Sequence, residues 1–417
     1  MPRMTPLWVM VLGIAALPVV PAAAADLGAS AAKPTPSVAD NAYQLNLLYT
    51  GEIWDNASGG LRQGVSYMNN IDAQLSIDTG KAFGWTGGTF VLEGFYANGV
   101  STGNSYVGAL DQQSPIDTAA GSPMLRLYQV YYDQVFGSTD VRFGIYDLET
   151  EFSNTKPMAL FLSKDLTWNT ALDQSGLMPQ NGTVGPGNYP YTPLALRVRQ
   201  NFGNQFSVQV AVADGAADNP NHLPLNGVEF SSHYGAMIMA EADYTPSKFD
   251  KFMAGVWTLT AKLPVYGQLT GGLQKMTYGE TGAYVGGAMR LYAQTPKRGL
   301  DGFFTVGVSQ PQSTNAAESF NAGFTYTGLL DSRPTDKVGI SMNANFASSY
   351  WKQASLLQGT PLSSTETSYE VTYRAKINEY LTMQPDVQYI VNPNYSRTIK
   401  NDLLVGLHFE VGHVFEW

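Results

Sequence analysis

Apolar and polar residues alternate along most of the chain, from about residue 43 to its end. Between Ile71 and Asp78, every odd position is apolar and every even position is polar. The same period of two runs through residues 206–212, 320–326, 342–346 and 369–377. Since successive side chains of a strand point to opposite faces, this pattern predicts two-faced β-strands.

About seventeen segments carry the pattern, and most approach the roughly 9 to 11 residues that a tilted membrane strand needs. Because single-chain bacterial barrels have even strand numbers, we predict about 16 strands, with about 18 as the alternative. The expected fold is an all-β, transmembrane antiparallel β-barrel with long extracellular loops. A soluble β-sandwich would alternate too, but these tracts continue far beyond the roughly 100 residues of one sandwich.

Aromatic residues gather towards the ends of the predicted strands, as in the interfacial girdles of membrane barrels. They are Tyr49, Trp54, Trp85, Tyr131, Tyr132, Tyr244, Tyr389, Phe415 and Trp417. The last predicted strand alternates over residues 403–412, and the sequence ends on an aromatic residue, Trp417. Such a strand is similar to the one that outer-membrane assembly machinery recognises, so this machinery is an expected partner, together with outer-membrane lipid.

The first 25 residues predict a secretory signal. Arg3 supplies a positive start, residues 7–20 form an apolar stretch, and Ala23-Ala24-Ala25 supplies a small-residue cleavage site. A transmembrane anchor is the alternative, but the apolar run is shorter than the roughly 20 residues of a span, and prolines interrupt it. We therefore expect cleavage after Ala25.

The composition favours a membrane barrel after this signal. Only 14% of the residues are charged, and cysteine is absent; soluble proteins have roughly 25% charged residues. With no long apolar run, the remaining membrane structure that pairs every backbone N–H and C=O is a closed barrel. We expect a flexible segment at residues 26–42 and the barrel at residues 43–417, in a Gram-negative outer membrane. The net charge of −10 disfavours nucleic acid as a partner.

Short runs distributed over the barrel carry a family resemblance. They are Trp85-Thr86-Gly87-Gly88-Thr89-Phe90, residues 126–134 (RLYQVYYDQ), residues 143–147 (FGIYD) and residues 384–393 (QPDVQYIVNP). Through these runs the sequence resembles the carbohydrate-selective porin family (the OprB type) over nearly all of residues 49–417. The resemblance implies passive diffusion of small, glucose-like sugars into the periplasm. Residues 51–62 depart from the Gly-Asp-Trp-Gly-Gly segment of many members, so no N-terminal plug is carried over.

The period of two also predicts which side chains face the lumen, because inward positions of a membrane barrel are polar. Both signs of charge occur there, and such walls can replace part of a sugar's hydration shell. The pore-lining and substrate-contacting candidates are Glu93, Arg126, Gln129, Asp133, Arg142, Tyr146, Asp147, Glu151, Trp168, Arg197, Arg199, Glu241, Arg290, Glu370 and Arg374. Further inward candidates are Asp72, Gln74, Asp78, Gln209, Asp243, Lys262, Tyr292, Lys376, Asp386, Gln388, His408 and Glu410.

Each of these residues can equally be a solvated lumen residue with no role in selection. Arg126 needs a separate interpretation, because it shares parity with Val130 and not with Gln129. We expect it to lie beyond the apolar band or beside a β-bulge, where an extra residue shifts the parity.

Residues 149–192 form a long segment without strand pattern, and such loops are usually functional. We expect it to fold inward and narrow the pore; an external loop without a role in permeation is the alternative. Its expected buried anchors are Phe152, Phe161 and Trp168, and its polar groups are Lys156, Lys164, Asp165 and Asp173. Segments 99–123 and 214–234 are also long, and are expected outside the barrel or folded into it.

No convincing catalytic arrangement is present, so we expect neither enzymatic activity nor a cofactor or metal. The histidines are His222, His233, His408 and His413, and only the pair at 222 and 233 flanks a loop near Ser231 and Ser232. A general diffusion or weakly anion-selective porin is the alternative within porins. A barrel enzyme and a structural or adhesive barrel are alternatives of another class. A monomer and a homotrimer both remain open.

Overall fold

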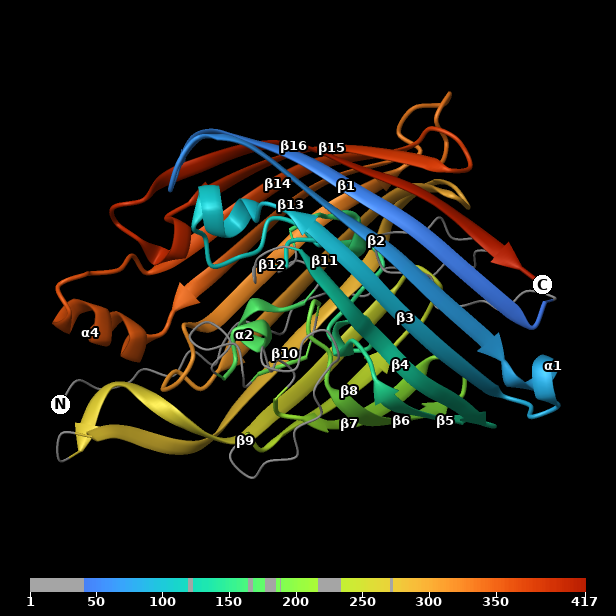
Figure 1. Ribbon diagram of the computed structural model, residues 1–417, viewed down its shortest axis with the longest axis horizontal. Helices are drawn as coiled ribbons and strands as arrows, with labels where there is room; N and C mark the ends of the chain where they lie inside the picture. Colours follow the sequence, from blue (N-terminus) through green and yellow to red (C-terminus); the bar gives the residue numbers. More distant parts are fainter. Residues whose placement is uncertain are drawn as a thin grey trace.

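The computed structural model describes residues 41–118, 123–163, 168–176, 185–187, 189–216, 234–270 and 273–417. Within these residues, sixteen strands pair in chain order and close into an antiparallel barrel (Figure 1). The strands are β1 (Tyr43–Gly60), β2 (Gly64–Asp78), β3 (Gly88–Gly99), β4 (Met124–Phe136), β5 (Thr139–Ile145), β6 (Leu194–Phe202), β7 (Phe206–Asp214), β8 (Ala236–Tyr244), β9 (Lys251–Thr270), β10 (Leu273–Thr295), β11 (Arg298–Ser309), β12 (Ala316–Thr327), β13 (Lys337–Ala347), β14 (Thr365–Lys376), β15 (Leu381–Val391) and β16 (Lys400–Glu416). The prediction of about 16 strands is confirmed, and the alternative of 18 is wrong.

Short helical segments occupy some of the connections. They are α1 (Thr79–Phe83), η1 (Gly103–Val107), η2 (Leu148–Thr150), η3 (Met158–Leu160), α2 (Thr170–Asp173), α4 (Ser349–Leu357) and η6 (Pro393–Tyr395). No helix in the described ranges is both long enough and apolar enough to cross a bilayer.

The barrel closes where its first and last strands meet. β1 pairs with β16, and the backbone groups of Tyr43 and Trp417 exchange two hydrogen bonds of 3.1 Å. Their rings stack with centroids 5.7 Å apart. The C-terminal aromatic residue therefore takes part in closure and leaves no open sheet edge at this end.

The two ends of the barrel differ in their connections. The end that carries Trp417 and α1, at the right in Figure 1, has short turns such as residues 137–138 and 203–205. The opposite end has the long connections 100–123 and 146–193, and there α4 and the β9–β10 hairpin extend outward (Figure 1). We refer to them as the short-turn end and the long-loop end.

The alternation along the sequence becomes an outward and an inward face of the wall. On β2, Ile71 is 51% exposed, whereas Asp72 is 4% exposed. The exposed apolar side chains form the surface that lipid can cover, and the polar ones lie inside. Among the predicted girdle residues, the exposed ones are Trp85, Tyr244, Tyr389, Phe415 and Trp417.

Two of the predicted girdle residues point inward, so that assignment is wrong for them. Trp54 is fully buried, and its indole N–H donates to Glu52 at 2.7 Å. Its ring lies over Gly406, where an added Cβ would be 2.3 Å away from it. Tyr131 carries the Arg142 guanidinium 4.3 Å from its ring centroid. The absence of a side chain at Gly406 leaves space for the Trp54 ring. The Tyr131 ring is stabilised inside by the Arg142 guanidinium through a cation–π contact.

A β-bulge decides the direction of Arg126. Glu93 pairs with Gln129 and Gly94 pairs with Leu127, so Tyr128 is an extra residue on β4. The extra residue shifts the parity, and the Arg126 side chain is buried inside the barrel. Of the two positions expected for Arg126, the one beside a bulge is therefore confirmed.

Two further inward predictions are wrong. On β9 the odd positions point inward, with Trp257 1% exposed, whereas Lys262 is exposed and shares parity with the outward Val256. On β10 a register shift follows Arg290 and leaves Tyr292 54% exposed. Strict alternation therefore does not predict which face of the wall a residue occupies once a register shift has intervened.

Candidate pore constriction

The connection between β5 and β6, residues 146–193, folds into the barrel; we call it the β5–β6 loop. The Ser153 N–H donates to Glu241 of β8 at 2.7 Å, and the Leu162 N–H donates to Glu370 of β14 at 2.7 Å. α2 of this loop lies inside the outline of the barrel (Figure 1). The predicted inward folding is confirmed for the described part of the loop; Lys164 and Asp165 lie outside the described residues.

Apolar side chains hold this loop against the inner wall. Phe152, Phe161 and Trp168 are at most 1% exposed, so their prediction as buried anchors is confirmed. Phe161 packs against Phe303 of β11 with ring centroids 5.5 Å apart. Trp168 belongs to a buried cluster that includes Met239 of β8. The loop thus crosses the lumen and contacts several sides of the wall.

The connection between β3 and β4, residues 100–123, also folds inward; we call it the β3–β4 loop. The N–H groups of Leu110 and Asp111 donate to the Glu366 carboxylate at 2.9 and 3.0 Å. The Asn343 side-chain amide donates to Asp111 at 2.6 Å. The sequence left open whether this segment lies outside or inside. The candidate loop residues His222, His233, Ser231 and Ser232 of the third long segment lie outside the described residues.

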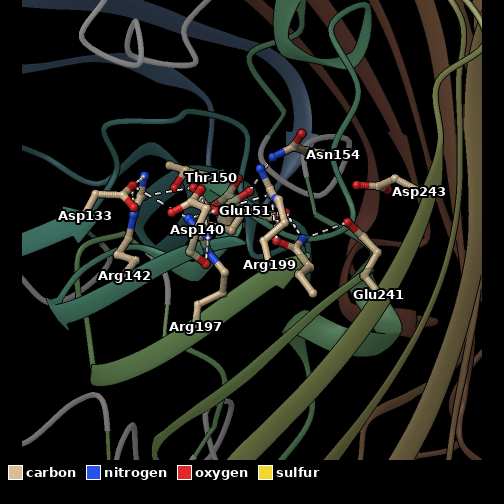
Figure 2. Close-up of polar contacts among 12 residues, drawn as sticks. Asp133, Asp140, Arg142, Thr150, Glu151, Asn154, Arg197, Arg199, Glu241 and Asp243 are labelled. Carbon is tan, nitrogen blue, oxygen red and sulfur yellow. Dashed lines mark hydrogen bonds and ion pairs between the residues drawn. The ribbon is translucent and has the colours of Figure 1, made fainter. Parts of the chain in front are cut away.

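Glu151 of the β5–β6 loop meets three arginines of the wall (Figure 2). Its Oε1 accepts a hydrogen bond from Arg142 at 2.8 Å, and its Oε2 lies 3.1 Å from Arg197 and 3.4 Å from Arg199. Burial opposes ionisation of this carboxyl, but the three guanidiniums outweigh it and hold the Glu151 pKa below its usual value. Glu151 therefore ties the loop to β5 and β6 as a carboxylate.

The same arginines pair with carboxylates of the wall itself. Arg142 lies 2.5 Å from Asp133 of β4, and Arg197 lies 2.9 Å from Asp140 of β5. Arg199 donates to the Gln209 amide oxygen at 2.6 Å. Hydrogen-bonded charges that alternate in sign neutralise one another and remain fixed in place.

The three arginines differ in how much of each a solute can reach. The side chain of Arg197 is 1% exposed and that of Arg142 is 7% exposed, whereas that of Arg199 is 28% exposed. Arg142 and Arg197 are thus committed to internal ion pairs. Arg199 keeps surface towards water and can donate to a solute.

A cavity of about 570 Å³ lies between these strands and the β5–β6 loop; we call it the arginine cavity. Arg199, Asp243 and Lys251 line it from the wall, and Asn154 and Lys156 line it from the loop. The Lys251 ammonium lies 3.1 Å from Asp243 and donates to the Asn154 carbonyl at 3.2 Å. Burial and the nearby Lys248 lower the pKa of Lys156. Donors and acceptors of both signs therefore surround one cavity.

A second cavity, of about 670 Å³, is lined by residues of β1, β2 and β13–β16; we call it the histidine cavity. Arg374 of β14 lies 2.5 Å from Glu410 of β16. His408 lies 2.7 Å from Glu52 through Nδ1 and 3.2 Å from Glu410 through Nε2. Ile116 of the β3–β4 loop lines its inner side. Each inserted loop thus borders one cavity.

Apart from the half-buried Arg290, the candidate residues from the sequence divide into two groups. Those that line a cavity are Asp133, Arg142, Glu151, Arg197, Arg199 and Arg374. Those that line neither cavity, all of them buried, are Glu93, Arg126, Gln129, Tyr146, Asp147, Trp168, Glu241 and Glu370. This second group has little surface open to either cavity, and its role as solute contacts stays a prediction.

The buried candidates are covered by loops or by neighbouring wall residues. Glu93 accepts hydrogen bonds from Gln74 and Gln129, both at 2.7 Å. Tyr128 donates to Asp147. The Arg290 guanidinium, on β10, forms an ion pair with the Asp301 carboxylate at 2.5 Å. Parity assigns these side chains to the interior, but it does not reveal what lies over them.

Sequence reasoning missed several polar groups of the arginine cavity, among them Asp140, Asn154 and Lys251. Asp140 shares parity with Arg142 on β5, which is a signal that could have found it. Lys251 shares parity with the inward Met253 at the start of β9. Asn154 lies in the loop, where no periodic pattern operates. Among the described residues, no His, Asp and Glu side chains gather in the threes that a metal site would need.

Comparison with known proteins identifies a family whose members this chain resembles over most of its length. Residues 62–412 match the family described as carbohydrate-selective porin, OprB family. Porin B of Pseudomonas aeruginosa is 26% identical to this chain over 410 residues, which cover 89% of this chain and 87% of that protein. The family match begins after β1 and ends within β16, so it includes both inserted loops.

Solved structures show the same fold. OprB of Pseudomonas putida, in its high-pH structure, superposes with a TM-score of 0.78 at 22% identity, covering 90% of this chain and 95% of that one. The outer membrane channel DcaP of Acinetobacter baumannii superposes with a TM-score of 0.55 at 9% identity, covering 89% and 97%. At these identities the likeness establishes the barrel architecture alone.

Proposed function

Because this chain belongs to the carbohydrate-selective porin, OprB family, we propose that the arginine cavity is the part of its pore that selects solutes. The protein is a passive outer-membrane porin with a preference for sugars. Its family and fold are those of a channel and not of an enzyme. What we propose beyond the family is where the selective region lies and which size of sugar it accepts.

The charge balance of the arginine cavity supports a neutral, hydroxyl-rich solute. Six basic and five acidic residues line it, so neither sign dominates. A wall of one sign would filter ions by charge, whereas a mixed wall offers donors and acceptors together. This balance is the observation that carries the proposal over the alternative of an anion-selective pore.

The exposed face of Arg199 supports a direct contact with the sugar. Glu151 and Gln209 hold its guanidinium at 3.4 and 2.6 Å, so little side-chain freedom is lost when a solute binds. The volume of about 570 Å³ lies within the range of small-molecule sites. We therefore place glucose-like monosaccharides in this cavity.

The remaining parts of the proposal concern export and assembly. Residues 1–25 serve as a signal peptide that is removed after Ala25, ahead of the barrel domain of residues 43–417; this signal, and residues 26–40 of the segment that follows it, lie outside the described residues. The short-turn end faces the periplasm, since membrane barrels have short periplasmic turns. The strand that ends at Trp417 is recognised during assembly, and the protein needs no cofactor. Catalytic activity is not expected.

The proposal is tested by measuring sugar block of the ion current in planar bilayers. Glucose should block the wild-type current, and Arg199→Gln should raise the half-blocking glucose concentration roughly tenfold, because a hydrogen bond from a charged group is lost. Arg298→Gln is the matched control, since Arg298 pairs with the 89% exposed Asp331 in a short turn. No block of the wild type contradicts sugar preference, and equal block of Arg199→Gln contradicts the location.

A further inference from the structure

Strand β14 carries two buried glutamates that bind the two inserted loops in the same way. Glu366 and Glu370 lie four positions apart on the inward face, and they are 0% and 2% exposed. Each carboxylate accepts hydrogen bonds from two consecutive backbone N–H groups, one on each oxygen. A carboxylate has two acceptor oxygens and no donor when ionised, so it suits two adjacent N–H groups of irregular backbone.

Glu366 holds the β3–β4 loop. Its Oε2 accepts the Leu110 N–H at 2.9 Å, and its Oε1 accepts the Asp111 N–H at 3.0 Å. The Asp111 side chain is held in turn by the amides of Asn343 and Asn345 on β13, at 2.6 and 2.5 Å. Five residues beyond Asp111, this loop lines the histidine cavity through Ile116.

Glu370 holds the β5–β6 loop. Its Oε1 accepts the Leu162 N–H at 2.7 Å, and its Oε2 accepts the Ser163 N–H at 3.1 Å. Close by, the Gln384 amide donates to the Leu160 carbonyl at 2.7 Å. The preceding part of this loop, residues 150–157, lines the arginine cavity. The wall opposite Arg199 therefore fixes the loop that faces Arg199.

We infer that Glu366 and Glu370 are positioning residues, each of which holds one inserted loop and thereby sets the width of one cavity. Glu366 acts on the histidine cavity through the β3–β4 loop. Glu370 acts on the arginine cavity through the β5–β6 loop. Neither carboxylate contacts the solute. The assignment of Glu370 to sugar selectivity rests on the proposed function; its control of loop position does not.

The physical basis is the cost of leaving a loop N–H without an acceptor inside the barrel. A Glu→Gln replacement exchanges one acceptor oxygen for an NH₂ group, which faces the loop N–H as a second donor. One hydrogen bond is lost, and two donors are brought together. The docked position of that loop should weaken, while the hydrogen bonds between strands remain.

The test uses the full protein in planar bilayers, with single-channel current as the readout. In Glu370→Gln, time spent in a wider conductance level should rise about tenfold, and the half-blocking glucose concentration should rise with it. Glu366→Gln should also widen the channel. Combining each variant with Arg199→Gln and Arg374→Gln then identifies the cavity. Glu370→Gln should be non-additive with Arg199→Gln and additive with Arg374→Gln, and Glu366→Gln should show the reverse.

Two controls separate loop positioning from general damage. Asp336→Asn removes a carboxylate that is 3% exposed in the β12–β13 turn and accepts hydrogen bonds from Arg333 and Tyr373 instead of from a loop N–H, so it should leave the current unchanged. Glu370→Asp retains the charge on a shorter side chain and should give a smaller change than Glu370→Gln. It also serves if Glu370→Gln does not fold, as judged by heat-modifiable migration in gels.

The outcomes distinguish this inference from the proposed function. A wild-type current that sugars do not block contradicts the proposed function, but the conductance levels still report loop position. Unchanged conductance levels in both glutamate variants overturn the inference, even if sugars block normally. Equal changes in Asp336→Asn, or additivity of Glu370→Gln with both arginine variants, also overturn it.

Discussion

The two sides of the barrel use the same alternating pattern for different purposes. On the arginine wall, β4–β9, polar side chains such as Arg199 and Asp243 line a cavity. On the loop-docking wall, β12–β15, residues such as Asn343, Glu370 and Gln384 bind the inserted loops. An inward polar position is therefore not by itself a pore-lining position; what covers it decides its role.

The difference follows from the needs of the loop backbone. A loop that enters the barrel leaves the strand ladder, and its N–H and C=O groups need other partners. The loop-docking wall supplies carboxylates and amides for them, as Glu370 does for Leu162. On the arginine wall Glu241 of β8 also accepts a loop N–H, from Ser153, but the arginines pair with neighbouring carboxylates, and Arg199 keeps part of its surface towards water.

Of the changes that separate the two walls, shortening the β5–β6 loop should have the largest effect on permeation. Deleting residues 156–163 removes the segment bound by Glu370 and uncovers the loop-docking wall. We expect single-channel conductance to rise severalfold and glucose block to be lost, because the narrow passage no longer exists. Conductance in planar bilayers measures this. An unchanged value would show that the loop does not limit permeation.

Acidification should have an intermediate effect, acting through Glu151. Because its pKa is lowered, the ion pairs with the arginines stabilise the docked loop at any pH above the ordinary value of about 4.3. This stabilisation is lost as the pH falls below that value towards the lowered pKa. Current noise should therefore stay constant from about pH 7 to 5 and rise below about pH 4.

The control for this pH dependence is Glu151→Gln, which cannot ionise at that position. Its current noise should already be raised at neutral pH and should change less on acidification. An identical pH profile for the wild type and this variant would mean that another group controls the loop.

The smallest effect is expected at Lys262, in a matched pair with Lys251 on the same strand. Lys251 lies 3.1 Å from Asp243 in the arginine cavity, whereas Lys262 is exposed on the outward face. Lys251→Gln should change the half-blocking glucose concentration a fewfold, and Lys262→Gln should leave it unchanged. A measurable effect of Lys262→Gln would contradict the assignment of the outward face of β9.

Particular residues show how far sequence reasoning reaches. Arg126 breaks the parity of its segment, and this break predicted either a bulge or a position beyond the apolar band; the β3–β4 ladder contains the bulge. Arg142, Arg197 and Arg199 follow from parity alone and lie together. Glu370 has the same parity signal, yet it lies beneath the β5–β6 loop. Trp54 was assigned to the girdle because aromatic residues are common there, and the glycine that receives its ring is on another strand.

The amino-acid pattern alone specifies a closed barrel with an apolar outside and a polar inside, because a strand's two faces follow from a period that is local in sequence. The pairing of Glu366 and Glu370 with the two loops depends on contacts across the lumen, between residues more than 200 positions apart. No local period encodes such contacts, since they arise only when the closed wall brings distant segments together. Which inward side chains meet the solute, and which hold a loop, is therefore settled by the folded barrel.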